Sequence, residues 1–588
     1  MYRFSRLFIL IIAIIVLVSF YILDTLSADI GIEAALQQEI ASGKKQVEVL
    51  IYMQDQADTE KVARQVQQDS PAKFAAGLQK ETLRFAVLEE LQQTAKKSQA
   101  GLIKYLEAKR QAGLVDQIEP YYISNIVYAR LDTQLVRKIA VRSDVRHVYA
   151  NSAIELAVPP PVSHLDDLYD DLYTWNLKQI NVPAAWEKYG FDGVGIVIGI
   201  IDTGVCLDQP ALQQSWRGNQ PAGYQSDYNW YDPVHKKALP DDINGHGTGV
   251  LGISMGARVD DNPQTGVAPG AEWIAARGLF DSGDSDRRTL LAAGQFMIAP
   301  TDSNNENPRP DLAPDIVINA WGGELGDDPW FIDIIYNWRC ANIFSVFAAG
   351  NSGAVEDSIH NPANYPDSFA VGAVDRDRKL SSFSSRGPGS FGEIIKPEVV
   401  APGEKVITVF PNDISTGSGT SFAAPHVAGA AALLLQADSS LKVCDIEEIL
   451  KSTALALTDT EYLDSPNYGY GFGLIDVIKA LDYVVKQKWI DLDSPQEAVP
   501  LDESWRINFN RSYSPQEITG IAIDSNNGVI PIYVDYEPDE KIAIVTPQRP
   551  YQPAENYELR IYLGNEKRYR IYFETVSEDH SEASFQFR

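Results

Sequence analysis

Residues 194–204 have the sequence VGIVIGIIDTG, an apolar run interrupted only by glycine and ending in Asp202, Thr203 and Gly204. A run without alternating polar residues predicts a strand buried on both faces, as in a parallel sheet covered by helices. Residues 343–349 form a second such run, and Val- and Ile-rich segments alternate with helical ones from about residue 175 to 484. This region is therefore predicted to have an α/β fold, with its site at the carboxyl ends of the strands.

The region before this sheet has a different pattern. It contains three predicted strands and two predicted helices, and Gly113 is expected to stop the first, longer helix. The strands are residues 46–53, 121–131 and 145–149, and the helices are residues 81–112 and 133–140. This order suits a small open α/β sandwich. Pro159, Pro160 and Pro161 then break the chain, and an aspartate-rich stretch follows at residues 164–173, so a domain boundary is predicted there.

The region after the sheet changes again, because residues 491–573 contain short segments with a period of two. Asn526, Asn527 and Gly528 provide a hairpin turn between two of these segments. The pattern predicts a β-sandwich, and residues 576–588 are predicted to be a polar tail.

Composition limits the classes of partner. The chain has 588 residues and a formal net charge of -30, from 80 acidic and 50 basic side chains. Such a charge repels nucleic acid and anionic membrane surfaces, which both require a positive footprint. The three cysteines, Cys206, Cys340 and Cys444, are too few for a disulfide framework and lack metal-ligand spacing, so we expect buried, inert thiols.

The N-terminus has the pattern of an export signal. Arg3 and Arg6 precede residues 7–23, an uncharged run in which Ser19 is the one polar break. The run is at the lower limit for spanning a bilayer, and Leu26 is large for a cleavage site at Leu26-Ser27-Ala28. Export is predicted, while cleaved signal peptide and retained anchor both stay open.

Three glycine-flanked motifs contain an acid, a base and a hydroxyl. They are centred on Asp202, on His246 in NGHGTGV (residues 244–250), and on Ser421 in GTSFAAPHVAG (residues 419–429). A serine hydroxyl is a weak nucleophile and needs a neighbouring base to accept its proton. The base in turn needs a carboxylate that orients it and stabilises the imidazolium. We therefore hypothesise that His246 and Asp202 activate Ser421.

Local sequence around these residues supports the hypothesis. Ser421 is predicted at a helix N-terminus, which favours negative charge, and Pro425 is predicted in the first turn of that helix. Gly245 and Gly247 are expected to leave space for a substrate backbone. Asn351, in AAGNSG (residues 348–353), follows a buried strand and offers an amide donor for the oxygen of a tetrahedral intermediate.

Each motif alone has a simpler explanation. Asp202 could be a turn residue, His246 a helix-entry residue, and Ser421 a helix N-cap. Four polar motifs that all lie at the edges of β/α elements are difficult to explain without a site.

With these flanks, the order Asp, His, Ser resembles the subtilases over roughly residues 175–480, and within them the bacillopeptidase F branch. The resemblance implies that Asp202, His246 and Ser421 form the triad and that Asn351 is the oxyanion donor. It also implies that Ala320, Trp321, Gly322 and Gly350 contact the substrate. Further matching segments are residues 175–177, 266–271, 313–315 and 361–366. Three positions depart from the family: Gly249 replaces a second histidine, which puts the packing there in doubt, and Ala320 replaces a common serine. The third is Cys206, which follows the aspartate motif closely and is similar in this to thiol-sensitive members, although a buried, inert thiol is expected.

The flanking regions are also similar to family modules. Residues 46–156 resemble an inhibitory, chaperone-like propeptide, and residues 491–573 resemble an immunoglobulin-like module. The predicted domains are a signal peptide or anchor (1–28), a propeptide (29–156), a linker and processing region (157–174), a catalytic domain (175–490), an immunoglobulin-like sandwich (491–575) and a tail (576–588).

These features predict a secreted serine endopeptidase made as a self-processing precursor. Its expected partners are protein or peptide substrates and its own propeptide, with no nucleic acid, and with a membrane only through the N-terminal segment. No cofactor is expected for catalysis. A structural calcium ion at Asp241 and Asp242 or at Asp327 and Asp328 stays open, against a simpler interpretation as solvated acidic loops. The alternatives are a catalytically inactive binding protein of the same fold and a narrow processing protease.

Overall fold

The computed structural model describes residues 31–69, 76–154, 172–323, 325–392, 394–486, 489–491, 496–499, 504–508, 518–525, 528–530, 532–537, 541–548, 550–552, 556–563 and 567–575. The predicted export segment, most of the predicted linker, the turn residues 526 and 527, and the polar tail lie outside these residues. The chain forms two compact units. One contains Met1–Asp58, Leu88–Ala153 and Asp286–Gln295, and the other contains Thr59–Val87, Ile154–Ser285 and Phe296–Arg588.

The first unit is built on a four-stranded antiparallel sheet of order β2-β3-β1-β4. Its strands are β1 (Gln46–Met53), β2 (Val115–Tyr121), β3 (Ile126–Asp132) and β4 (Val145–Ala150). The predicted strands at 46–53 and 145–149 are confirmed. The single strand predicted at 121–131 is wrong, because Asn125 has a φ of 48° and turns the chain between β2 and β3.

Different elements pack on the two faces of this sheet. One face carries side chains of β1 such as Val49 and Ile51, which share a core with Leu36 of α2 (Ala34–Ala41), Leu102 and Leu106 of α4 (Ala76–Gln111), and Ile139 of α5 (Val136–Ala140). On the other face, residues from the start of α10 (Arg287–Ile298) contact the strands: the Arg288 guanidinium lies 4.9 Å from the ring centre of Tyr128. The helix predicted at 81–112 is confirmed as part of α4, which begins five residues earlier.

The second unit contains the predicted parallel sheet. Seven strands lie in the order β15-β14-β13-β12-β6-β10-β9, and every neighbouring pair is parallel. The strands are β6 (Val197–Asp202), β9 (Trp230–Tyr231), β10 (Glu272–Arg277), β12 (Ile316–Asn319), β13 (Phe344–Ala348), β14 (Phe369–Val374) and β15 (Val399–Pro402). The two apolar runs that predicted buried strands are β6 and β13, so the α/β fold class is confirmed.

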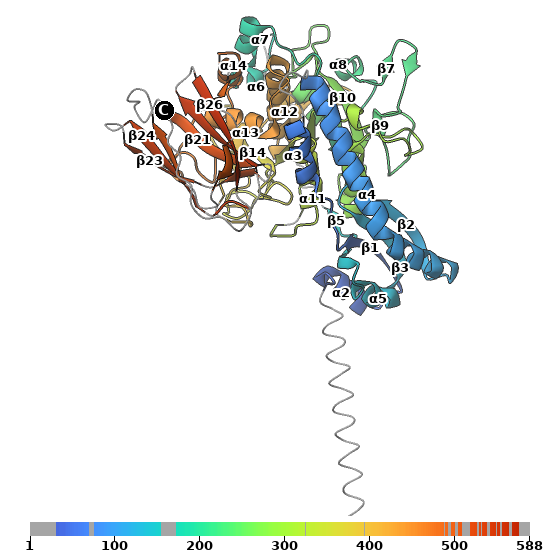
Figure 1. Ribbon diagram of the computed structural model, residues 1–588. Helices are drawn as coiled ribbons and strands as arrows, with labels where there is room; N and C mark the ends of the chain where they lie inside the picture. Colours follow the sequence, from blue (N-terminus) through green and yellow to red (C-terminus); the bar gives the residue numbers. More distant parts are fainter. Residues whose placement is uncertain are drawn as a thin grey trace, which may run out of the picture. The chain divides into compact units, whose positions relative to one another are not determined.

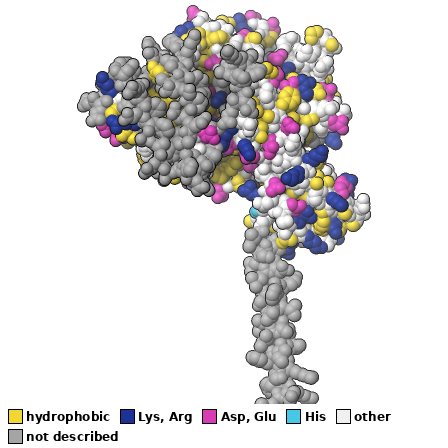
Figure 2. All heavy atoms as spheres, viewed as in Figure 1, with side chains coloured by type: hydrophobic (Ala, Val, Ile, Leu, Met, Phe, Trp, Pro, Cys, Tyr) yellow, Lys and Arg dark blue, Asp and Glu magenta, His cyan; other side chains and the backbone are white. Residues whose placement is uncertain are grey.

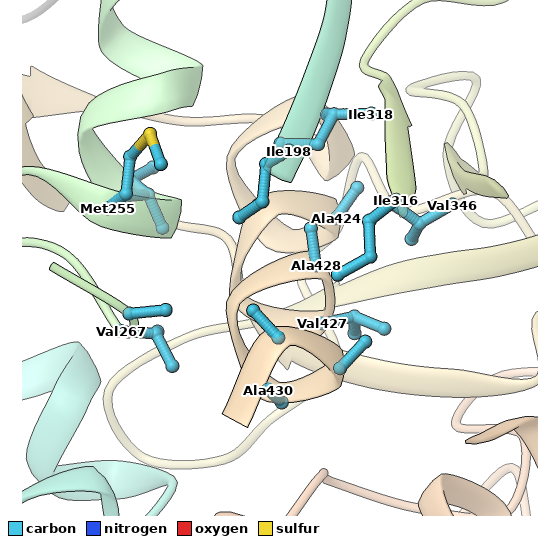
Figure 3. Packing of buried hydrophobic residues seen from close by; sticks show 14 of the residues in the cluster. Ile198, Met255, Val267, Ile316, Ile318, Val346, Ala424, Val427, Ala428 and Ala430 are labelled. Atoms are coloured by element: carbon cyan, nitrogen blue, oxygen red, sulfur yellow. The ribbon is translucent and has the colours of Figure 1, made fainter. Parts of the chain in front are cut away.

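Helix α12 (Thr420–Ala437) lies in the core of this unit (Figure 3). Every residue from Thr420 to Leu435 is buried, and small side chains such as Ala424 and Ala428 lie beside Ile198 of β6 and Ile316 of β12. Helix α9 (His246–Met255) runs next to it, with Met255 in the same cluster. Because alanine and glycine allow close approach, α12 packs tightly against the sheet, and its N-terminus is held firmly.

The C-terminal strands form two sheets around one core (Figure 1). One sheet contains, in spatial order, β18 (Trp489–Asp491), β26 (Lys567–Thr575), β25 (Asn556–Leu563), β21 (Ile518–Ser525) and β22 (Gly528–Ile530), with β19 (Gln496–Val499) also paired to β26. The other contains, in spatial order, β20 (Trp505–Asn508), β24 (Ile542–Pro547) and β23 (Ile532–Glu537). Trp505 and Val545 of the smaller sheet and Leu559 and Phe573 of the larger one belong to the same hydrophobic cluster, which makes this a sandwich. Ser525 pairs with Gly528, as the predicted hairpin requires. The likeness to immunoglobulin modules stays a prediction.

The remaining elements connect these layers. The helices are α3 (Thr59–Asp69), α6 (Trp175–Gln179), α7 (Val182–Tyr189), α8 (Pro210–Gln213), α11 (Ile332–Cys340), α13 (Val443–Ser452), α14 (Val477–Lys486) and the 3-10 turns η1 (Thr133–Leu135) and η2 (Pro310–Leu312). The strands are β5 (Ala153–Ile154), β7 (Asn219–Gln220), β8 (Gly223–Tyr224), β11 (Ser285–Asp286), β16 (Val406–Val409) and β17 (Ile414–Gly417).

The described surface carries charges of both signs. Figure 2 shows acidic and basic side chains interspersed over the described surface in that view. Within the described ranges, no helix combines the length and the apolar character needed to cross a membrane.

Candidate active site

The carboxyl ends of three neighbouring strands bring the predicted site residues to one edge of the sheet. Asp202 is the last residue of β6, Ala320 directly follows β12, and Asn351 follows β13 by three residues. His246 and Ser421 lie at the N-termini of α9 and α12, which pack against each other. The placement follows from the parallel topology, because the ends of parallel strands meet at the same edge.

Asp202 and His246 form a buried pair. Nδ1 of His246 lies 2.7 Å from Oδ1 of Asp202, and the two residues are 4% and 1% exposed. Burial lowers the pKa of His246, but the charge of Asp202, its hydrogen bond to the ring, and the charge of Asp242 together outweigh burial and raise the pKa above 6.5. The carboxylate therefore orients the ring with Nδ1 as the donor and stabilises its protonated form.

Asp242 fixes the start of helix α9. Its Oδ1 accepts hydrogen bonds from Thr203 Oγ1 (2.9 Å) and the Gly245 N–H (2.8 Å). Its Oδ2 accepts from the N–H (2.9 Å) and the hydroxyl (2.7 Å) of Thr248. Burial raises the pKa of Asp242 in spite of these four donors. The interpretation of Asp241 and Asp242 as a solvated acidic loop is therefore wrong for Asp242. This buried carboxylate positions the start of α9, the helix that begins at His246.

The glycines beside His246 serve packing. A Cβ at Gly247 would overlap the carbonyl oxygen of Gly204 and lie 3.0 Å from Cβ of Asp202. Gly245 has a φ of 89°, in the left-handed region. The expectation that Gly247 leaves room for a substrate backbone is wrong, because its missing side chain lets α9 approach the Asp202 loop.

Ser421 lies at the second position of α12, where the helix N-terminus favours negative charge. Its Oγ is buried and makes no hydrogen bond in the structure, and the same holds for Nε2 of His246. The ring of the next residue, Phe422, meets the His246 ring edge-on, with their centres 5.7 Å apart. The start of α12 thus lies beside the His246 ring, and no hydrogen bond joins Ser421 Oγ to His246 Nε2 in the structure. Such contacts often tighten only when substrate is bound.

Pro425 is not in the first turn as predicted. Helix α12 begins at Thr420, so Pro425 is its sixth residue and lies inside the helix. Its nitrogen stands where an N–H would bond the carbonyl of Ser421, four residues earlier.

A small cavity lies beside Ser421. Its lining residues are Ala320, Trp321, Gly322, Ala348, Gly350, Asn351, His360, Thr420 and Ser421. All four predicted substrate-contact residues and the predicted oxyanion donor are therefore brought together with Ser421. A concave site with a few directed polar groups is what a substrate side chain and a reacting carbonyl require.

Thr420 orients the amide of Asn351. Its N–H and its hydroxyl both donate to Oδ1 of Asn351, at 2.9 and 3.1 Å. The same hydroxyl accepts from the N–H of Gly350 at 3.0 Å. Because Oδ1 is held by two donors, the Nδ2 end of the amide is the end that can donate to a substrate oxygen.

The sequence patterns do not predict that His360 lies in the cavity wall. It lies between two glycines of the cavity wall: a Cβ at Gly350 would overlap its ring, and a Cβ at Gly322 would lie 2.9 Å from its Cβ. Its Nε2 lies 2.6 Å from Ser352 Oγ, and burial lowers its pKa although the backbone of Gly323 raises it. No motif surrounds His360 that predicts this position, apart from the matching segment at residues 361–366 that follows it.

Two of the three departures from the family pattern, Gly249 and Ala320, have simple consequences. A Cβ at Gly249 would lie 3.0 and 3.2 Å from two ring atoms of Phe410, so this phenylalanine occupies space that a larger residue would need. Ala320 is buried and still lines the cavity.

The cysteines and the acidic groups bear on the predictions about thiols and metal ions. None of the three cysteines forms a disulfide bond; Cys340 is buried as expected, whereas Cys206 and Cys444 are half-buried. Burial raises the pKa of Cys206 and that of Cys340, the latter to about 12, which keeps both as thiols. Asp241 forms an ion pair with the buried Arg277. In the described part of the chain, no group of three or more His, Cys, Asp or Glu side chains could hold a metal ion.

The sequence comparisons agree with this geometry. Residues 193–473 match the subtilase family. The chain is 32% identical to subtilisin DY of Bacillus licheniformis over 50% of its own length and 92% of that protein. The chain belongs to the subtilase family.

Within the family, the chain is 40% identical to bacillopeptidase F of Bacillus subtilis (strain 168) over 456 residues, which are 75% of this chain. This similarity confirms the predicted bacillopeptidase F-like branch. The match spans about a third of that relative, 32% of its length. Subtilisin Savinase of Lederbergia lenta is 30% identical over 51% of this chain and 96% of its own.

Proposed function

We propose that this chain is a secreted serine endopeptidase that hydrolyses peptide bonds of proteins and is made as a self-processing precursor. The observation that carries the proposal is the convergence of Ser421, Asn351 and the substrate-contact residues on one cavity, beside a buried Asp202–His246 pair. Family membership supports the reaction class.

In the proposed mechanism, Ser421 Oγ attacks the carbonyl carbon of the scissile bond while Nε2 of His246 accepts its proton. Asp202 stabilises the imidazolium, and Nδ2 of Asn351 donates to the oxyanion as the carbonyl oxygen gains charge. His246 then gives the proton to the leaving amine, so an acyl-enzyme remains on Ser421. Water repeats the sequence and releases the acid. Side chains and water suffice for these steps, so no cofactor is proposed for catalysis.

We further propose that residues 29–156 are the inhibitory propeptide and that the enzyme cuts its own chain within residues 156–173. The position of Ile154, the last described residue before this segment, supports the idea. Ile154 is 3% exposed, and its side chain lies 3.3 and 3.5 Å from where a Cβ at Gly323 would be. The chain thus runs beside the substrate-contact residues just before the expected cut.

N-terminal sequencing of the extracellular protein tests this proposal, with wild type and Ser421→Ala produced in a secreting host. The wild type is expected to begin between residues 156 and 173, whereas Ser421→Ala keeps its propeptide. A fully active protein beginning between residues 26 and 46 would contradict processing. A wild type with no peptidase activity after the propeptide has been removed would favour the alternative, a binding protein of the same fold.

A further inference from the structure

Residues Thr59–Val87 belong to the region proposed as propeptide, yet they form part of the unit that contains the parallel sheet. They comprise α3 and the first part of α4. Helix α3 packs against α11, and the side chains of Leu83 and Val87 on α4 are 8% and 0% exposed. We refer to the described residues of this stretch, 59–69 and 76–87, as the docking arm. None of its residues lines the cavity beside Ser421.

Arg84 is the centre of this contact. Its Nη1 donates to the carbonyl of Ala313 at 2.8 Å, and its Nη2 donates to the carbonyl of Pro314 at 2.7 Å. Nη2 also lies 3.2 Å from Oδ1 of Asp315, and Nε lies 3.4 Å from the carbonyl of Ala341. Three carbonyls and one carboxylate therefore surround the guanidinium. We refer to these four acceptors as the arginine socket.

The arginine socket is buried, and its acceptors favour arginine over lysine. The side chains of Arg84 and Asp315 are 3% and 8% exposed, and Lys80 of the docking arm forms a second ion pair with Asp315. Oδ2 of Asp315 accepts the N–H of Val197, the first residue of β6, at 3.1 Å. A planar guanidinium with five donors fits several acceptors at once, which an ammonium group does not. A buried charge that loses its partner is strongly destabilising, so the contact depends on Arg84.

A second contact lies at the other end of the docking arm. Thr59 Oγ1 donates to Oδ1 of Asn337 at 2.7 Å, and the hydroxyl of Tyr336 donates to Oε2 of Glu60 at 2.9 Å. Thr59 is fully buried and Glu60 is 6% exposed. The docking arm thus contacts α11 through specific polar bonds as well as through apolar surface.

We propose that the docking arm is a holding device that keeps the cleaved propeptide on the catalytic domain through the arginine socket, independently of the catalytic cavity. The proposal rests on the processing described under Proposed function. The partner that this surface recognises is a helix presenting an arginine, supplied by the chain's own propeptide. Cleavage of the chain and release of the propeptide are then separate events, and the second is controlled at Arg84.

The test makes the cut without the enzyme's own activity. A site for a sequence-specific protease is inserted within residues 157–171 of the full-length Ser421→Ala precursor, and the added protease cleaves it. Dissociation of the N-terminal fragment is then followed by size-exclusion chromatography and surface plasmon resonance. Arg84→Met removes the charge and keeps the length of the side chain. Arg110→Ala, on the same helix, is the matched control, since the side chain of Arg110 is 51% exposed.

With the socket intact, the fragment is expected to stay bound after cleavage. Arg84→Met should raise its dissociation rate at least about 30-fold, since removal of one partner of a buried charge pair acts mainly on dissociation. Arg110→Ala should leave the rate within about twofold. Thr59→Val removes one buried hydrogen bond and should raise the rate about 2- to 13-fold, which keeps the test decisive if Arg84→Met does not fold.

Equal dissociation rates in the parent, Arg84→Met and Thr59→Val proteins would overturn the proposal, as would immediate release from the parent. A wild-type precursor that fails to cut itself would contradict the proposed processing. That failure is distinguishable, because the dissociation experiment uses a different protease.

Discussion

Thr420 is predicted to act on catalysis through Asn351 alone. Its hydroxyl bridges two groups of the cavity wall, donating to Oδ1 of Asn351 and accepting the N–H of Gly350. Thr420→Val keeps the shape and removes both bonds. Asn351 then keeps one of the two donors that fix its orientation, the N–H of residue 420.

The magnitude follows from these bonds. A hydrogen bond of this kind contributes about 0.5–1.5 kcal/mol net, so kcat should fall about 2- to 13-fold. KM should not change, because the amide acts on charge that develops in the transition state. The N–H of Gly350 loses its acceptor in a buried site, so the free energy of unfolding should fall by about 1–3 kcal/mol. Thr420→Ser retains the hydroxyl and is the control.

Steady-state hydrolysis of a peptide substrate, well below the unfolding temperature, measures the effect. The decisive comparison is a double-mutant cycle with Asn351→Ala. Once Asn351 is absent, Thr420→Val should change kcat by less than about twofold. An equal loss of kcat with and without Asn351 would refute the idea that Thr420 works by orienting the amide.

Three further predictions concern the triad and its packing. Ser421→Ala should lower kcat by about a million-fold with folding retained, a magnitude known for subtilisin itself and carried over from that relative; near-normal turnover would end the assignment. Because the pKa of His246 is raised, the neutral base is lost as pH falls, so the acid limb of kcat/KM should lie above pH 6.5, and a limb below that value would contradict the Asp202 interaction. Gly249→His should destabilise the protein by about 1–3 kcal/mol through contact with Phe410, and Phe410→Ala should restore much of the loss in thermal unfolding; destabilisation that persists without Phe410 would show another cause.

The parallel sheet was predictable because its strands are buried on both faces and therefore lack polar residues. In a parallel sheet, the residues that follow such runs lie at the same edge. The sequence alone therefore predicts that Asp202 and Asn351 lie at one edge. The strand predicted at residues 121–131 failed for a local reason. Its apolar residues suit a strand, but the turn depends on the left-handed backbone of Asn125, which the pattern does not reveal.

Contacts between distant residues were not predictable. His360 lies in the cavity wall because Gly322 and Gly350 leave room for its side chain. Thr420 lies there with its hydroxyl bonded to the amide of Asn351. No spacing in the sequence encodes either contact. The sequence around His246 suggests that Gly247 faces the substrate, but in the structure Gly247 contacts the Asp202 loop. Residues 313–315 matched the family pattern without an explanation, and the structure makes them acceptors for Arg84.

The most direct test of the central proposal is covalent labelling by a fluorophosphonate, which reacts with a serine only where a base activates it. The propeptide-free extracellular protein is treated, digested and mapped by mass spectrometry, beside Ser421→Ala and His246→Ala from which the propeptide has been removed with an added protease. Wild type should carry one label, on Ser421, and both variants should carry none. A folded, propeptide-free wild type that is unlabelled at Ser421 would contradict the proposal that this chain is a serine peptidase.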